Sequence, residues 1–536
     1  MKKFPFILLF FFLISAGADG SGEESSSEKG LRAINEDVIK AQLGFLSSDW
    51  MEGREAAEKG AYLASDYIAS MLRLYGIAPA GDMFSAGAAG KKQSKQEKSY
   101  FQNFTLLKST PGDLQIMKIK YTAQGASKII DLAYKVDFIV RPGEPGVETE
   151  APVVFAGYGY YDDSLKYNDF SNIDVKGKFI LKFSGLPKFA GNITDFYALM
   201  QIRNRLDAKY RAMGAAGVIE FDPDAVVAGS PETRDFMNMS PSEGVAVQGG
   251  PYYRYTIPGK KFPESLPRVQ VSVRVADAIL SGSGTDIDEY RARADRNEKV
   301  SPPGLKERTI YLQTTSNTTQ VNVRNVIGVI EGKDPDKYIV IGAHYDHVGM
   351  GNGYIWNGAD DNGSGTVGVM TIARAFMAAG TKPECTVIIA LWTAEEEGLL
   401  GSRYWVRNLS FPASRIKLNM NFDMISRYIS DNEPNKVTMT YTSSFPWFRD
   451  ITIANMKKYG IDLDVEYQPS PDPPGGTDHR SFVEMGVPVM RFKPGHREEY
   501  HTPKDEYRTL DWDIMEKIVK IGFLNTWELA NSNWVE

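Results

Sequence analysis

Potential metal ligands recur at the ends of apolar runs between Ile339 and Asp423 of this 536-residue chain. The first run, IVIGAHYDHVG, ends in His344 and Asp346, and the second, IIALWTAEEEG, ends in three glutamates that begin at Glu395. The third run ends at Asp423, and a Gly-rich segment, NGADDNGSG, adds a pair of aspartates between the first two runs. Imidazole and carboxylate groups are typical zinc ligands, and open α/β sheets collect ligands at the carboxyl ends of their strands. The stretch therefore predicts half of a metal-hydrolase site.

Each motif by itself also has an ordinary structural explanation. His344 and Asp346 are two residues apart at a strand end and point to the same side, as a surface polar pair also would. Asp360 and Asp361 could belong to a turn that caps the next helix, and the glutamates could form a solvated helix start. The combination is far more specific than any one motif, because candidate ligands follow several successive strands.

The elements that must position these residues alternate along the chain from Val326 onward. Apolar runs predict strands and amphipathic patterns predict helices between them. The predicted strands cover 338–342, 386–392, 417–421, 437–441 and 489–492, and the predicted helices cover 364–379, 447–459 and 512–529. Such alternation predicts an α/β fold with a mixed, mostly parallel sheet flanked by helices.

Two helices are expected before this region, between Ile34 and about Tyr75. Apolar residues recur there at helical spacing. They are Ile39, Leu43 and Leu46 on one face of the first helix, and Leu63, Tyr67, Met71 and Leu74 on one face of the second. The segment Met51-Glu52-Gly53-Arg54 lies between the two helices.

The block from about Leu114 to Arg308 has a different character. Short strands are predicted at 153–156, 179–182 and 217–221, and a helix over roughly 195–213. None of the five histidines falls in this block. We therefore interpret it as an inserted module that does not belong to the active site.

Composition narrows the classes of protein further. Hydrophobic residues make up 42% and charged residues 24%, as in ordinary globular chains, and the length favours more than one domain. The net charge of −7 and the lack of a long basic run argue against a nucleic-acid partner. Cys385 is the only cysteine, so the chain can form no intrachain disulfide and nothing suggests thiol catalysis.

The N-terminus has the pattern of a secretory signal peptide over residues 1–18. Lys2 and Lys3 precede an apolar run, and Ala16-Gly17-Ala18 supplies small residues at cleavage spacing. The apolar run is short for a membrane span, although an uncleaved anchor is the alternative. A polar segment follows, and we predict a flexible linker over 19–33. The mature protein is thus expected to be exported, periplasmic or extracellular, soluble and free of the membrane.

Taken together, the motifs GAHYDHVG, GADDNGSG, AEEEGLLGS, NFDM and YHTPKDE resemble the M28 family of co-catalytic zinc peptidases, of the aminopeptidase type. The inserted block resembles a protease-associated (PA) domain through VVFAGYGYYDD, DFSNIDVKGKFIL and AMGAAGVIEF. This resemblance implies a zinc-exopeptidase fold, of the phosphorylase/hydrolase-like type, with an inserted β-rich PA domain. The peptidase domain would consist of residues 34–113 and 309–536, and the PA domain of residues 114–308.

The resemblance also implies a ligand set for two Zn²⁺ ions per chain. The five matching positions are His344, Asp361, Glu396, Asp423 and His501. Asp361 would bridge the ions, His344 and Asp423 would complete one site, and Glu396 and His501 would complete the other. The family pattern G-x-x-D-x-x-S-G selects Asp361 over Asp360, and A-E-E-x-G-L-x-G-S selects Glu395 and Glu396 from the three glutamates.

Further residues receive roles from the same resemblance. Glu395 would be the general base, and Tyr500 would steady the transition state. Asp346 would orient His344 from behind, and Asp478 in GGTDHRSF would support the ligands without binding metal. We interpret His347 as a residue that caps the strand or lies at the rim.

The implied function is an exported di-zinc exopeptidase that removes N-terminal residues from peptides. A hydroxide bridging the metals would attack, with Glu395 as base, and the PA domain would shape or partly cover the cleft. Alternatives are a glutamate-carboxypeptidase-like enzyme or dipeptidase, a glutaminyl-cyclase-like enzyme with one zinc, and a non-catalytic receptor-like protein. A carboxypeptidase would need an arginine for the substrate's carboxylate, and the candidates are Arg427, Arg480, Arg491 and Arg497. The oligomeric state does not follow from the sequence.

Overall fold

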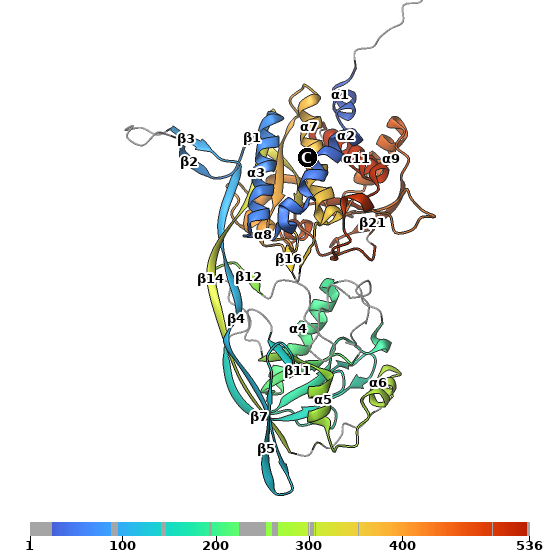
Figure 1. The fold of residues 1–536 in the computed structure, drawn as a ribbon. Helices are drawn as coiled ribbons and strands as arrows, with labels where there is room; N and C mark the ends of the chain where they lie inside the picture. The colour runs from blue at the N-terminus through green and yellow to red at the C-terminus, as the bar shows by residue number, and fades with distance from the viewer. Residues whose placement is uncertain are drawn as a thin grey trace, which may run out of the picture.

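The chain folds into two bodies with separate hydrophobic cores in the computed structural model (Figure 1). The model describes residues 24–86, 95–140, 146–191, 196–223, 253–259, 266–298, 300, 305, 307–351, 353–495 and 497–532. The larger core combines buried residues from Ile34 to Tyr100 with others from Val326 to Ala530. The second core is built only from residues between Met117 and Leu312. The predicted inserted module is therefore a body with its own interior.

A long antiparallel ribbon joins the two bodies. Its strands are β4 (Phe101–Ala123) and β14 (Arg308–Ile330), paired from Val326 opposite Phe101 to Arg308 opposite Tyr121. Each strand contributes to both bodies (Figure 1). The boundary that we expected after residue 113 falls inside β4, so hydrogen-bonded strands, and not linkers, connect the bodies.

The sheet of the larger body is mixed and mostly parallel, as predicted. Its order is β21-β20-β22-β19-β15-β18-β14, and β15 pairs in parallel with both β18 and β19. The antiparallel pairs in this body include β14 with β18 and β20 with β22. The strands not yet given bounds are β15 (Asp334–His344), β18 (Cys385–Trp392), β19 (Ile416–Phe422), β20 (Lys436–Thr442), β21 (Asp464–Ser470) and β22 (Val489–Lys493). All five predicted strands of this region are present.

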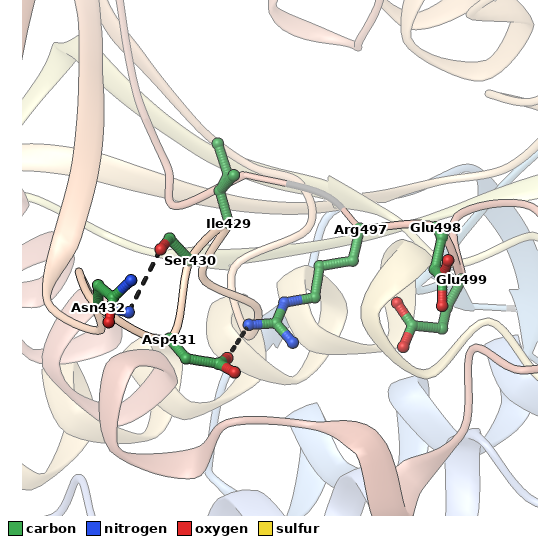
Figure 2. A pocket seen from close by; sticks show the side chains of 7 residues that line it. All are labelled: Ile429, Ser430, Asp431, Asn432, Arg497, Glu498 and Glu499. Atoms are coloured by element: carbon green, nitrogen blue, oxygen red, sulfur yellow. Dashed lines mark hydrogen bonds and ion pairs between the residues drawn. The ribbon is translucent and has the colours of Figure 1, made fainter.

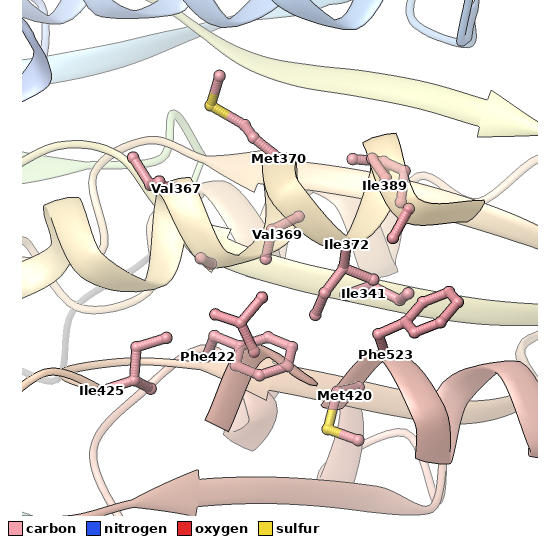
Figure 3. Packing of buried hydrophobic residues seen from close by; sticks show 14 of the residues in the cluster. Ile341, Val367, Val369, Met370, Ile372, Ile389, Met420, Phe422, Ile425 and Phe523 are labelled. Atoms are coloured by element: carbon pink, nitrogen blue, oxygen red, sulfur yellow. The ribbon is translucent and has the colours of Figure 1, made fainter. Parts of the chain in front are cut away.

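Helices cover both faces of this sheet. The face shown in Figure 3 packs against α7 (Gly365–Ala378) and α11 (Trp512–Asn531), with α2 (Glu36–Leu46) and α3 (Lys59–Leu74) alongside. The opposite face packs against α8 (Leu400–Arg407) and α10 (His479–Val483). Because side chains alternate along a strand, Ile341 of β15 faces the first layer and Val340 faces the second. Burying one such side chain contributes about 1.5–3 kcal/mol.

The predicted helices of this body are present, but the flexible linker that we expected over 19–33 is wrong for its second half. Within the segment predicted to be a flexible linker, residues Ser26–Arg32 form helix α1. Ser25 and Glu28 form a reciprocal capping box at its start, and Gly30 packs against the ring of Phe523 in α11. A polar sequence without apolar periodicity therefore forms a helix through its cap and its docking. The predicted signal peptide lies outside the described residues.

Helix α3 buries a different face from the one that the apolar spacing predicted. Leu63 and Leu74 are 41% and 73% exposed, whereas Ala64, Ile68 and Leu72 are fully buried. Small alanines on the buried face let the helix lie close to the sheet, and Leu72 reaches β14 near Gly328. The prediction of the buried face was wrong because it relied on the large side chains of Leu63 and Leu74, which are exposed, whereas the small side chain of Ala64 is buried.

The second body has a smaller sheet in the order β7-β10-β11-β13-β6, whose first three pairs are parallel. Its elements include β5 (Ala126–Leu132), β6 (Phe138–Val140), β7 (Val147–Phe155), β10 (Phe179–Phe183), β11 (Gly217–Phe221), β13 (Arg268–Val271), α4 (Phe196–Ala212), α5 (Val273–Leu280) and α6 (Ile287–Asp295). The predicted strands and helix are present. Strand β12 (Arg254–Thr256) leaves this body and pairs with β4 at Leu107–Ser109, close to the larger body.

None of the helices in the described part of the chain combines the length and the apolar character that crossing a bilayer requires.

Substitutions at Leu72 and Leu74 test the observed face of α3. Leu72→Ala should lower the free energy of unfolding by about 2–5 kcal/mol, because it leaves a cavity in the core. Leu74→Ala should change it by less than about 0.5 kcal/mol, because that side chain is exposed. Urea unfolding followed by tryptophan fluorescence measures both. Equal losses for the two variants would contradict the observed orientation of the helix.

Candidate metal centre

Parallel pairing brings the ends of three strands to one edge of the sheet. His344 at the end of β15 lies opposite Trp392 at the end of β18, and Gly342 lies opposite Asn421 near the end of β19. The segments that follow these strands carry the candidate ligands, and the segment after β22 returns to the same edge with His501. Residues more than 150 positions apart thus share one site because parallel strands end together.

The Gly-rich loop before α7 reaches the same edge through an unusually close backbone approach. Gly358 has a φ of 55°, and a Cβ atom there would lie 2.2 Å from the carbonyl oxygen of Asp361 and 2.5 Å from the ring of His347. Only glycine fits both constraints. The peptide bond between Asp361 and Asn362 is cis. This turn aims the carboxylate of Asp361 into the site.

Two groups of nitrogen and oxygen donors face each other at this edge. In the first group, Nε2 of His344 lies 3.7 Å from Oδ1 of Asp423 and 3.9 Å from Oε2 of Glu395, and it also lies 3.5 Å from Oδ1 of Asp361, a member of the second group. His344 is 1% exposed, so the group is closed to bulk water on that side.

The second group forms around His501. Its Nε2 lies 3.0 Å from Oδ2 of Asp361 and 3.1 Å from Oε2 of Glu396. His347 completes the group, with Nδ1 placed 2.8 Å from Oε1 of Glu396 and 3.9 Å from Oδ2 of Asp361. Asp361 therefore presents one oxygen to each group and joins them.

The donor sets fit zinc. Donors bound tetrahedrally at about 2.0–2.2 Å lie roughly 3.3–3.6 Å from one another, close to the separations in both groups. Nε2 of His501 is buried and makes no hydrogen bond of acceptable angle, although two carboxylate oxygens lie within 3.1 Å. A ring nitrogen that lies between two carboxylates belongs to a set of donors that suits a cation. The five predicted ligands His344, Asp361, Glu396, Asp423 and His501 could hold two ions.

The charges of the site point to the same need for cations. Burial alone would lower the pKa of His344, but Glu395, Asp423 and Asp361 raise it well above its ordinary value. Burial also disfavours a charged His501, yet Glu396 and Asp361 raise the pKa of this side chain strongly. Crowded carboxylates thus attract positive charge, whether from protons or from metal ions.

Glu395 differs from the other carboxylates of the site. Burial, followed by the like charges of Glu396 and Asp478, raises the pKa of Glu395 well above its usual range despite the opposing effect of His344. For Glu396, burial acts in the same direction, but His501 and His347 lower the pKa well below its usual range. Neighbouring glutamates therefore differ, one holding a proton readily and one remaining ionised.

Asp346, which the family resemblance assigns to orienting His344, lies next to the Nδ1 side of that ring. Nδ1 of His344 is 3.2 Å from the backbone oxygen of Asp346 and 3.8 Å from its Oδ1. The carboxylate also accepts hydrogen bonds from the backbone amides of Glu395 and Glu396, at 3.2 and 3.4 Å. It therefore connects the end of β15 to the glutamate loop.

Asp478 and Tyr500 flank the groups from two sides. Asp478 is fully buried at the start of α10, and burial together with the charge of Asp423 raises its pKa to about 7, against the effect of His344. The ring of Tyr500 stacks on His501 with centroids 3.9 Å apart, and 42% of the residue is exposed. Tyr500 therefore lies where the site meets solvent.

Asp360 and Glu397, the sequence neighbours of the predicted ligands Asp361 and Glu396, point away from the two donor groups. Oδ1 of Asp360 accepts hydrogen bonds from the backbone and the hydroxyl of Ser426, both at 2.9 Å. Glu397 faces Tyr255 of the second body, whose backbone amide donates to it. Both residues lie outside the two groups of donors, whereas Asp361, Glu395 and Glu396 lie within them.

Three residues in or beside the site escaped the sequence analysis as functional candidates. His347, interpreted as a capping residue, lies in the second donor group. Asp505 accepts hydrogen bonds from the backbone amides of Asp360 and Asp361, both at 2.9 Å. Arg54 lies beneath the loops that carry the ligands. The spacing of His347 from His344 was the only available signal for it, and Asp505 and Arg54 act through long-range backbone contacts that no local pattern reveals.

Comparison with known proteins agrees with this geometry. Residues 325–523 match the model of Peptidase family M28, a range that contains every candidate ligand. Leucine aminopeptidase 2 of Arthroderma otae is 30% identical over 204 residues, which cover 37% of this chain and 39% of that protein. The chain thus matches about two fifths of the length of this curated relative.

Solved structures share the fold over nearly the whole chain. An aminopeptidase from Aneurinibacillus sp. strain AM-1 superposes with a TM-score of 0.57 at 18% identity, covering 95% of this chain and 97% of that one. A zinc aminopeptidase from Bacillus subtilis gives a TM-score of 0.54 at 18% identity, covering 94% and 96%. The mixed, mostly parallel α/β fold expected from the sequence is confirmed, and residues 325–523 are a domain of peptidase family M28.

Proposed function

We propose that this protein is an exported di-zinc aminopeptidase that releases N-terminal residues from peptides. One observation carries the proposal: two groups of largely buried nitrogen and oxygen donors lie side by side, and Asp361 of one group places Oδ1 3.5 Å from Nε2 of His344 in the other. His344 and Asp423 would hold one ion, and Glu396 and His501 the other. The names of the matched relative and of the two solved structures favour an aminopeptidase.

When bound, two zinc ions supply Lewis-acid polarisation of the scissile carbonyl and acidify a water molecule. The chain's own residues would do the remaining work. Glu395 lies 3.9 Å from Nε2 of His344 and holds a proton readily, so it suits the transfer of a proton to the leaving amine. Tyr500, at the solvent edge of the site, would donate a hydrogen bond to the negatively charged oxygen of the transition state.

Other residues would hold the ligands in place. Asp346 would orient His344 through the contacts at Nδ1. His347 donates from Nδ1 to Oε1 of Glu396, which leaves Oε2 directed toward His501. We assign His347 this orienting role because burial lowers its pKa and keeps the ring neutral. Asp478 would support the first group from the start of α10.

Three of the four arginines that a carboxypeptidase could use, namely Arg427, Arg480 and Arg497, form ion pairs with acidic residues. Arg427 contacts Glu499 at 3.1 Å and Asp505 at 3.6 Å, and Arg480 contacts Asp472 at 2.6 Å. Figure 2 shows Arg497 directed toward Asp431 across a pocket of about 520 Å³, at 2.5 Å. These pairings leave little positive charge for a substrate carboxylate and disfavour the carboxypeptidase alternative.

The same pocket favours a cationic group. It lies between residues 429–432, which follow the Asp423 strand, and residues 497–499, which lead into Tyr500 and His501 (Figure 2). Its charged lining consists of three acidic residues and one arginine: Asp431, Glu498, Glu499 and Arg497. Asp431 and Glu499 are already paired with Arg497 and Arg427, so Glu498 is the lining acid that would attract the free amino terminus of a peptide.

We also propose that the second body is a PA domain that forms one wall of the site. Tyr255 of β12 packs with Ala56, Ala394 and Leu400, and its hydroxyl donates to the carbonyl of Ala56 at 2.9 Å. The loop from Ala394 to Leu400 contains Glu395 and Glu396. The second body thus supports the loop that carries the proposed base. Export rests on the N-terminal sequence alone.

Zinc content tests the shared role of Asp361 and separates this proposal from a single-zinc enzyme. Wild-type protein should contain about two zinc ions per chain by elemental analysis. Asp361→Asn should lower the content at both sites, whereas His501→Ala should remove only one ion, because Asp361 has one oxygen near His344 and the other near His501. Asp360→Asn is the matched control and should keep two. One ion in the wild type would contradict the di-zinc proposal.

Glu395→Gln tests the proposed base. The variant should retain zinc but lose about 10²–10⁴-fold in kcat, because Gln cannot transfer the proton. Glu397→Gln is the control. Burial, with Asp346 and Glu396, raises the pKa of Glu397 to about 8, so this side chain is largely neutral at pH 7 and Gln resembles it. Unchanged turnover in Glu395→Gln would remove that residue from the mechanism and leave the metal centre intact.

Substrate termini test the direction of attack. Leucyl-anilide should be hydrolysed, and its N-acetylated form should show a kcat/KM lower by about 100-fold or more, since a hydrogen bond to a charged group contributes about 1.5–3 kcal/mol. Peptides with an amidated carboxyl terminus should be cleaved as well as free ones. Preference for acetylated peptides with a free carboxylate would instead support the carboxypeptidase alternative.

A further inference from the structure

Arg54 is a buried charged residue that the proposed mechanism does not use. Only 1% of it is exposed, yet its guanidinium makes four hydrogen bonds, all to backbone carbonyl oxygens. Nε donates to Tyr345 at 2.8 Å, and Nη2 donates to Gly358 at 2.8 Å. Nη1 donates to Leu46 at 2.7 Å and to Asn357 at 2.6 Å.

Three of the four acceptors belong to the segments that carry the metal donors, and the fourth, Leu46, ends α2. Tyr345 lies between His344 and Asp346 at the end of β15. Asn357 and Gly358 begin the turn that directs Asp361 into the site. The guanidinium therefore spans the gap between the strand end with His344 and the loop with the shared carboxylate.

The backbone around Arg54 is held to the same region. The amide of His347 donates to the carbonyl of Arg54 at 3.2 Å, and the amide of Gly349 donates to Gly53 at 3.0 Å. Gly53 has a φ of 67°, and a Cβ atom there would lie 2.2 Å from the carbonyl oxygen of Gly349. The turn before Arg54 therefore fits closely against the segment after β15, and the guanidinium has little freedom to move.

The charge of Arg54 also faces the acidic residues of the site. The nearest negative charges are those of Asp505, Asp346, Asp361 and Glu396. Asp505 in turn accepts hydrogen bonds from the amides of Asp360 and Asp361. The loop is thus held through its carbonyls by Arg54 and through its amides by Asp505. A buried guanidinium is costly unless its donors are satisfied, and here the satisfying groups are the ligand-bearing loops.

We propose that Arg54 is a positioning residue of the metal centre: it fixes the spacing between His344 and Asp361, and thereby the affinity for zinc. This inference rests on the proposed zinc centre. A planar fork with five donors can bind carbonyls in several directions at once, whereas the ammonium group of lysine acts as a compact point charge. Geometry, and not charge alone, is therefore the property that matters, and lysine should not replace Arg54.

The test compares Arg54→Lys and Arg54→Gln with Arg324→Gln. Arg324 is a matched control, since its side chain bonds to Ser65 at 2.8 Å and to the carbonyl of Tyr62 at 2.9 Å in α3, away from the donor groups. Zinc affinity of the metal-free proteins is measured by competition with a chromophoric chelator, and stability by thermal unfolding. We expect both Arg54 variants to bind zinc about 10–100-fold more weakly. Arg324→Gln should lower the Tm while its zinc affinity stays unchanged.

Zinc affinities of both Arg54 variants within twofold of wild type would overturn the proposal, as would an equal loss in Arg324→Gln. Amide hydrogen exchange of the wild type decides the matter if the Arg54 variants do not fold. Zinc loading should slow exchange over residues 50–55 together with residues 345–347 and 358–363, and no change over residues 50–55 would also overturn the proposal. Wild-type protein that binds no zinc would refute the proposed function itself. If the wild type binds zinc normally and the Arg54 variants bind it as tightly as the wild type, only this inference is refuted and the proposed function stands.

Discussion

The crowding of acidic side chains at one edge of the sheet is the constraint on which the rest of the structure depends. Asp361, Glu395, Glu396 and Asp423 lie close together in largely buried positions. An isolated buried carboxylate is strongly disfavoured unless it is paired or coordinates a metal. His344 and His501 lie between these carboxylates, and their strongly raised pKa values show how much positive charge the site demands.

A rigid scaffold is needed to hold such a group against its own repulsion. The ends of β15, β18 and β19 are set by parallel pairing, and α7 locks them from one side through a packed core that includes Ile341, Met420 and Phe422 (Figure 3). Around the donors lies a layer of residues that bond to the ligands or to the backbone of the segments that carry them, namely Asp346, His347, Asp505 and Arg54. The precision of the site comes from these contacts, because loops alone would not hold like charges together.

The second body is connected to the site more closely than its separate core suggests. The ribbon of β4 and β14 passes through both cores, and β12 brings Tyr255 to the loop that contains the glutamates. Lys108, on the ribbon, lies 4.0 Å from the ring centroid of Tyr253 and 2.9 Å from Glu58. Tyr255 of β12 thus packs against Ala394, the residue before Glu395.

The sequence by itself determined the class of fold and the types of ligand. Long apolar runs separated by helical patterns predict an α/β sheet, because these patterns are local and periodic. Polar residues that follow successive strands predict a site at one edge of that sheet, because parallel strands end together. The α1 helix and the buried face of α3 could not be read in this way, since docking of Gly30 against Phe523 and of small alanines against the sheet decides them.

The tertiary structure gave the physical reason why Asp361 faces the site, a choice that the family pattern had already made, and it alone revealed the parts of His347 and Arg54. Asp360 and Asp361 are adjacent and chemically identical, yet the turn at Gly358 sends one toward Ser426 and the other between the two histidines. His347 and Arg54 became part of the site through contacts with residues 49 and about 300 positions away. Such contacts depend on how separate elements pack, and no spacing along the chain encodes them.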